Sequence, residues 1–180
     1  MSKKIPLIAK PSSDEYPAYA SMYMKWLPDD GLILMHIKDQ LEKTKKFVSR
    51  LSDEQLALRY APGKWSIKET LVHIIDDERI YAYRALRIGR GDTTPLPGFE
   101  QDDYVPYSKA DHRSLNSILK EYTTVRKATL SLFRNFAEQD LLRKGMANGN
   151  TVSVRALLYH IAGHELHHLH IIKDKYLGIS

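Results

Sequence analysis

Cysteine is absent from this chain of 180 residues, which excludes disulfides, thiolate metal ligands and a cysteine nucleophile of the protein's own. Long apolar runs are also absent, since no stretch approaches the ~18 apolar residues of a membrane-spanning helix. The N-terminus has no apolar segment of the kind found in signal peptides. We therefore predict a cytoplasmic protein with no membrane partner, built as a single domain over residues 1–180.

A strong excess of one charge is lacking too. The formal net charge is +5 at pH 7, and the basic residues are spread along the chain with only small clusters. Binding to nucleic acid asks for a denser basic stripe or a recognisable module. We therefore predict no nucleic-acid partner.

Convincing alternation of apolar and polar residues is missing, which argues against strands. Instead, four segments repeat apolar residues at three- and four-residue spacing, which is the pattern of amphipathic helices. They cover about residues 34–51, 66–89, 111–136 and 153–176. The second begins with the capping box Ser66–Glu69. Residues 1–30 are interpreted as an irregular N-terminal arm, and Gly145–Asn150 as a loop.

Four helices of this length predict an all-α four-helix bundle. The connection Gly89–Tyr107 is rich in glycine and proline, so it is not helical throughout. It is long enough to cross the bundle. We expect it to roof a pocket for a small-molecule substrate at one end of the bundle.

Histidine is concentrated near the C-terminus, where four of the eight lie between residues 164 and 170. His164 and His168 are four residues apart, so they share one face of the predicted helix. They fall on its core stripe, where an unpartnered polar group costs about 1–3 kcal/mol. One divalent metal ion shared by both imidazoles removes that cost. This predicts a metal site in preference to two core histidines bonded to other side chains.

The run His164–His168 also matches the H-E-x-x-H pattern of zinc proteases, in which Glu165 would act as the general base. The longer form of that motif needs glycine at position 171 and histidine at 174, where this chain has Ile171 and Asp174. An all-helical chain also offers no sheet edge for an extended peptide. A protease is therefore disfavoured.

The residue pattern leaves the third metal ligand open. His73 flanks the apolar stripe of its helix and is one candidate. Asp76 and Asp77 lie about one turn further on, and either could ligate or accept a hydrogen bond from a ligating imidazole. His160 is interpreted as a residue near the substrate, as a support for a ligand, or as a buried neutral histidine.

Several motifs together resemble the DinB/YfiT-like family of metal-dependent enzymes, over about residues 11–177. They are APGKWS at residues 61–66, His73 with Asp76, RALRIGRGD at residues 84–92, and AGHELHH at residues 162–168. The resemblance implies a four-helix bundle with one long crossover connection. It also implies a metal site formed by His73, His164 and His168, with water in the remaining coordination positions.

Some members of that family look like transferases that join a low-molecular-weight thiol to an electrophile. We therefore predict a metal-dependent transferase that uses an exogenous thiol as co-substrate, because a coordinating thiol is deprotonated. One alternative is a hydrolase in which the metal activates water. Glu165 would then be the base, or else a structural carboxylate that anchors a histidine. Another alternative is a non-catalytic metal-binding or dimerisation module. Zinc or nickel is the expected metal, with iron as a further candidate.

Four aromatic residues mark the N-terminal arm, namely Tyr16, Tyr19, Tyr23 and Trp26. Such side chains either pack back on the bundle or become buried against a second subunit. The resemblance favours a homodimer.

Overall fold

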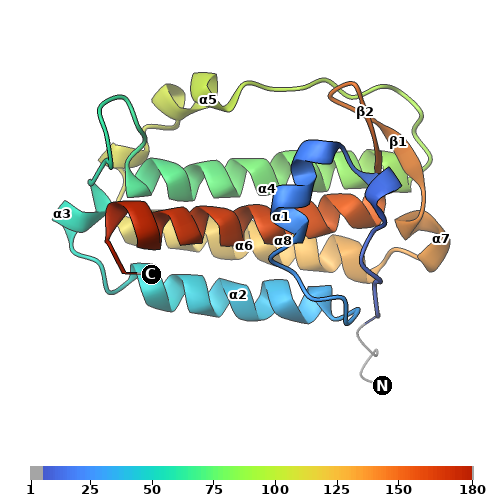
Figure 1. The fold of residues 1–180 in the computed structure, drawn as a ribbon, viewed down its shortest axis with the longest axis horizontal. Coiled ribbons are helices and arrows are strands. Elements are labelled where there is room, and N and C mark those ends of the chain that lie inside the picture. Colours follow the sequence, from blue (N-terminus) through green and yellow to red (C-terminus); the bar gives the residue numbers. More distant parts are fainter. Residues whose placement is uncertain (1–5, 180) are drawn as a thin grey trace.

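Four long helices lie side by side in the computed structural model, which describes residues 6–179 (Figure 1). They are α2 (Ile33–Val48), α4 (Ile67–Gly89), α6 (Leu115–Arg134) and α8 (Val154–Ile171), and α8 continues into a π-helical turn, Ile172–Tyr176. The predicted four-helix bundle is confirmed. Among the described residues, none of the helices is both long and apolar enough to cross a membrane.

The connection between α4 and α6 is the predicted crossover. Figure 1 shows these two helices running in the same direction, so the chain returns along the length of the bundle between them. The short helix α5 (Gln101–Ser108) lies within this return, followed by a 3-10 turn, Ala110–His112. Two other short helices, α3 (Asp53–Leu56) and α7 (Glu138–Leu141), occupy the remaining connections.

A small antiparallel hairpin was not predicted. Its strands are β1 (Lys144–Ala147) and β2 (Asn150–Ser153), and they include the segment interpreted as a loop. Asn148 and Gly149 between them have φ angles of +50° and +69°. Two left-handed residues in succession form the tight turn that a twisted hairpin requires, and Asn-Gly is its preferred sequence. The Asn148–Gly149 pair was therefore the signal for this hairpin.

Side-chain caps fix where the two histidine-bearing helices begin. The Ser66 hydroxyl accepts a hydrogen bond from the Glu69 amide at 3.0 Å, and the Glu69 carboxylate accepts one from the Ser66 amide at 2.8 Å. The predicted capping box at the start of α4 is thus formed. At the start of α8, the Ser153 hydroxyl accepts a hydrogen bond from the Ala156 amide at 3.1 Å. Each cap satisfies an amide that the helix itself leaves unpaired.

One arginine in the core contacts all four long helices. Arg126 of α6 is fully buried, and its guanidinium donates to both carboxylate oxygens of Glu78 on α4 at 2.9 Å. It also donates to Glu165 on α8 at 2.7 Å and to the carbonyl oxygen of Ile37 on α2 at 2.8 Å. The second oxygen of Glu165 accepts a hydrogen bond from Thr44 of α2 at 2.6 Å. Because buried charges must be paired, this network specifies how the helices face one another.

The N-terminal arm is partly helical, with 3-10 turns at Ser13–Glu15 and Ala18–Ala20 and the short helix α1 (Ser21–Met24). It packs along α8, where the backbone of Tyr23 meets Gly163. A Cβ atom at Gly163 would lie 2.4 Å from the carbonyl oxygen of Tyr23, so this approach requires glycine. The arm therefore covers its own bundle at Tyr23. Residues 1–5 of the predicted arm lie outside the described residues, and the homodimer stays a prediction.

We expect Arg126→Met to destabilise the fold by about 3–5 kcal/mol, since it leaves two buried carboxylates without their cation. The matched control is Arg79→Met. Arg79 is half exposed and bonds to Glu121 at 2.5 Å, and exposed pairs contribute about 0–1 kcal/mol. Urea unfolding of both variants measures the difference, and equal losses would contradict the structural role of Arg126.

Candidate metal centre

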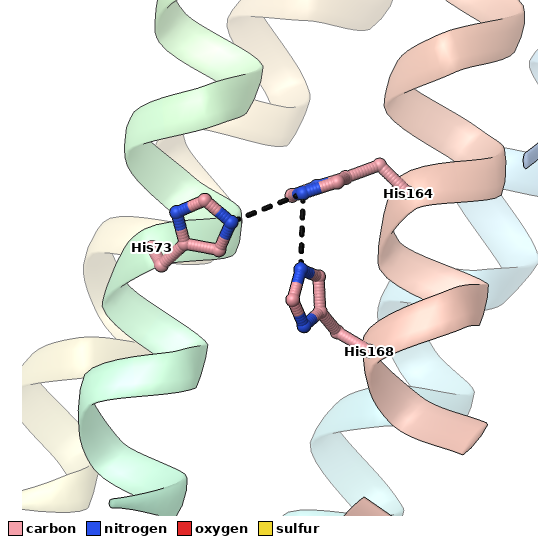
Figure 2. A group of neighbouring side chains, drawn as sticks. All are labelled: His73, His164 and His168. Carbon is pink, nitrogen blue, oxygen red and sulfur yellow. Dashed lines mark hydrogen bonds between the residues drawn. The ribbon is translucent and has the colours of Figure 1, made fainter. Parts of the chain in front are cut away.

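Three imidazoles from two helices converge inside the bundle (Figure 2). The Nε2 atom of His164 on α8 lies 3.0 Å from the Nε2 atom of His73 on α4 and 3.1 Å from that of His168. The apolar stripe predicted the pairing of His164 with His168, and the fold adds His73 from the facing helix. The structure thus brings together the three predicted ligands. That they bind a metal stays a prediction.

The donor set of these histidines fits a divalent cation. The single lone pair or proton on His164 Nε2 faces two other ring nitrogens, so hydrogen bonding alone cannot satisfy both contacts. Three nitrogens that each lie about 2.0–2.1 Å from a shared ion are separated from one another by roughly 2.9–3.4 Å for right-angled to tetrahedral geometry. The two separations from His164, 3.0 and 3.1 Å, fall in that range.

Burial keeps the three imidazoles in the form that binds metals. It is the largest cause that lowers the pKa of His73, and it holds the pKa values of His164 and His168 well below the ordinary range. Neighbouring imidazoles lower the pKa values of His164 and His168 further, because two adjacent positive charges repel. At neutral pH all three rings are therefore neutral and carry free lone pairs.

Aromatic rings and one carboxylate surround the histidines. The ring of Trp65 lies 4.8 Å from that of His73, and the ring of Tyr23 lies 5.4 Å from that of His164. The carboxylate of Asp77 is buried on the inner side of the site, 3.3 Å from Nδ1 of His164. Its ion-pair partners within residues 6–179 are imidazoles alone. A buried carboxylate without a lysine or arginine partner also favours a cation nearby.

The site opens into a pocket of about 690 Å³, which His168 reaches from the inside. Its walls include Trp65 and Tyr176, and basic side chains at its rim include Lys64. Residues of α5, among them Asp102, also line it. The Gly89–Tyr107 connection therefore lines a pocket, as predicted from the sequence. The volume is typical of sites for small molecules.

Core side chains bind the carboxylate of Glu165, and its predicted role at the metal centre stays a prediction. Its carboxylate accepts hydrogen bonds from Thr44, Tyr122 and Arg126, which occupy both of its oxygens. The reason is helix geometry, since the residue after His164 lies ~100° around α8 and faces α2 and α6. The sequence pattern H-E-x-x-H is present, but its glutamate belongs to the core.

The other candidates differ in position. Asp76 is partly exposed and lies 3.5 Å from Arg79, whereas Asp77 faces the histidines. His160 is buried, with its ring stacked 3.7 Å from that of Tyr81. Sequence reasoning missed the core partner Arg126. The signal was its position four residues after Tyr122, which puts both residues on the same face of α6. A charged residue on an apolar helix face needs buried partners.

The fold and the three converging histidines define a helical bundle with a candidate metal centre. Residues 36–172 match the family model described as the DinB superfamily. Because this match covers more than half of the chain, the protein belongs to the DinB superfamily.

Relatives of known name agree with this assignment. OB0413 of Oceanobacillus iheyensis, provisionally named as a metal-dependent hydrolase, is 28% identical over 142 residues, covering 78% of this chain and 81% of that protein. YfiT from Bacillus subtilis, described as "a probable metal-dependent hydrolase with an unusual four-helix bundle topology", has a similar fold. Its TM-score is 0.72 at 16% identity, covering 95% of this chain and 94% of that chain. The fold is also similar to that of YjoA, a DinB-like protein from Bacillus subtilis. The TM-score is 0.56 at 20% identity, covering 79% of this chain and 87% of that chain.

We expect His73→Ala, His164→Ala and His168→Ala each to weaken metal binding by at least about tenfold, since even the loss of a supporting residue costs that much. Elemental analysis of protein purified without a metal-affinity tag measures the loss. The control is His36→Ala, because His36 is partly exposed and bonds to Asp30 at 2.8 Å. Full metal occupancy in His73→Ala would show that the third ligand is a different residue.

The metal-free protein should lose stability as the pH falls below about 6.5, the ordinary pKa of histidine. Folding lowers the pKa values of His73, His164 and His168, so the unfolded chain binds more protons in this window. The free energy of unfolding is therefore greatest above the pKa of the unfolded chain. It falls as the pH drops toward the folded pKa values, by about 1.4 kcal/mol per pH unit for each additional proton that the unfolded chain binds.

Urea unfolding of metal-free protein at several pH values tests this dependence. The variant His164→Phe should show a shallower loss over the same range, because it removes the most buried of the three imidazoles. An equal slope in the variant and in the original protein would contradict this explanation.

Proposed function

We propose that this protein is a metal-dependent hydrolase that acts on a small-molecule substrate. The observation that carries the proposal is the convergence of three imidazoles beside a pocket of about 690 Å³. Three protein ligands leave a coordination position free, as in catalytic rather than structural sites. Hydrolysis is the reaction named for the relatives OB0413 and YfiT.

A bound zinc or nickel ion would activate a nucleophile and polarise the substrate as a Lewis acid. His73, His164 and His168 would hold the ion. The pocket walls would hold the substrate, and they include the aromatic side chains of Trp65 and Tyr60. We place this activity in the cytoplasm.

The pocket lining includes one cation that a negatively charged group of the substrate could meet, alongside the carboxylate of Asp102. Arg59 lines the pocket, but its guanidinium already bonds to Glu69 and Asp111 at 2.5 and 2.7 Å. Lys64 also lines the pocket, and the ion pairs of residues 6–179 do not include it. Its ammonium group is therefore the cation that a carboxylate or phosphate on the substrate would meet.

Transfer of an exogenous thiol to an electrophile is the second candidate function. The placement of Glu165 in the core favours it, since the base expected from the H-E-x-x-H pattern is absent from the site. A thiol that coordinates a metal loses its proton without a protein base. The chain has no cysteine that would compete with that thiol.

A substrate panel separates the two functions. Zinc- or nickel-loaded protein is assayed with chromogenic esters and amides, and separately with a small thiol plus a chromogenic electrophile. We expect the original protein to hydrolyse these substrates, and His168→Ala to do so no faster than metal-free protein. We also expect Lys64→Ala to raise KM for anionic esters more than for neutral ones. Thiol conjugation in the absence of ester or amide hydrolysis would favour the thiol transferase over the hydrolase.

The role of Glu165 has its own test. Glu165→Gln keeps the shape of the side chain, so a core role predicts lower stability with little change in the pH dependence of the remaining activity. A catalytic base would instead give full stability, full metal content and loss of the low-pH limb of the pH–rate profile, where activity rises as the base loses its proton. Unfolding and kinetics measured on the same variant decide between the two roles.

A further inference from the structure

On the facing sides of α4 and α8, further buried polar side chains lie next to the three histidines. Asp77 lies one turn after His73 on α4, and His160 lies one turn before His164 on α8. Both side chains are buried, at 4% and 5% exposure. The oxygen Oδ2 of Asp77 lies 3.3 Å from Nδ1 of His164 and 3.4 Å from Nε2 of His160. His164 is thus the shared member of two adjacent groups.

Both nitrogens of the His164 ring face polar atoms, on opposite sides of the ring. Its Nε2 atom faces His73 and His168, and its Nδ1 atom faces Asp77. A carboxylate can only accept hydrogen bonds, so its favourable partner is the Nδ1–H tautomer of a neutral imidazole. That tautomer leaves the lone pair on Nε2, where the other two histidines point.

We propose that Asp77 is the positioning residue of the metal centre, and that it fixes the tautomer and ring orientation of His164. Its charge would also offset part of the positive charge of a buried ion and make the imidazole a stronger ligand. Asp76, the neighbouring carboxylate, pairs with Arg79 at 3.5 Å, and within residues 6–179 it forms no ion pair with a histidine. The inference rests on metal binding by the three histidines, and it holds for hydrolysis and thiol transfer alike.

His160 holds Asp77 in place in this arrangement. Its ring is stacked on Tyr81 with centroids 3.7 Å apart and planes at 3°, and Tyr23 covers its edge at 4.8 Å. Its Nε2 atom and Asp77 Oδ2 are both buried and lie 3.4 Å apart, and within residues 6–179 neither has a hydrogen-bond partner of ideal geometry. With the ring clamped between aromatic side chains, Nε2 points at the same carboxylate oxygen that faces His164.

The experiment compares Asp77→Asn with Asp76→Asn, two changes of equal size on neighbouring residues. Zinc affinity is measured by competition with a chromogenic chelator, and ligand geometry by the visible spectrum of cobalt-substituted protein. We expect about 10- to 100-fold weaker zinc binding in Asp77→Asn, with one ion still bound per chain, as supporting carboxylates of ligating histidines generally show. Its cobalt spectrum should shift, whereas Asp76→Asn should match the original protein in both measurements.

Two results would overturn the inference. One is unchanged zinc affinity and an unchanged cobalt spectrum in Asp77→Asn. The other is two zinc ions per chain in the original protein and one in Asp77→Asn, which would make Asp77 a ligand of a second ion together with His160 and His164.

A measurement on the unaltered sequence covers the case in which Asp77→Asn does not fold. Nitrogen-15 NMR of histidine-labelled, metal-free protein reports which nitrogen of His164 carries the proton. We expect the proton on Nδ1, beside Asp77. A proton on Nε2 would overturn the inference.

Discussion

The fold and the metal centre both depend on the buried contact of Arg126 with Glu78 and Glu165. This arginine lies on α6 and binds one carboxylate from α4 and one from α8. Each carboxylate directly follows a residue of the site, since Glu78 follows Asp77 and Glu165 follows His164. Successive residues point about 100° apart around a helix. Fixing Glu78 and Glu165 toward α6 therefore fixes the rotation at which α4 and α8 present their histidines to each other.

This arrangement explains why a buried ionic network is useful in a bundle that is otherwise held together by apolar packing. Such networks add little net stability, because desolvation of the charges offsets most of their attraction. Their value here is orientation. Apolar side chains tolerate small rotations of a helix, whereas the bidentate contact between Arg126 and Glu78 does not. Imidazole nitrogens only 3.0–3.1 Å apart need that restriction.

The positions of the long helices can be predicted from the periodicity of the sequence, but the set of residues that form the site can be predicted only in part. Three- and four-residue spacing and the Ser66–Glu69 capping box locate the long helices, and the same spacing places His164 and His168 on one face. The third member of the group, His73, depends on how α4 faces α8, which local pattern does not specify. Glu165 was predicted to be a catalytic base or a carboxylate that anchors a histidine, because the H-E-x-x-H motif alone does not reveal the side chains of α2 and α6 that bind it. The hairpin was missed because four-residue strands are too short for alternation to be visible.

X-ray absorption at the zinc or nickel edge tests the central claim most directly, because it counts the ligands on the bound ion. The account predicts one ion per chain with three imidazole nitrogens at about 2.0–2.1 Å and oxygen ligands in the remaining positions. The number of imidazoles should fall to two in His73→Ala. An ion bound mainly through carboxylate or water oxygens, with one imidazole or none, would contradict the account.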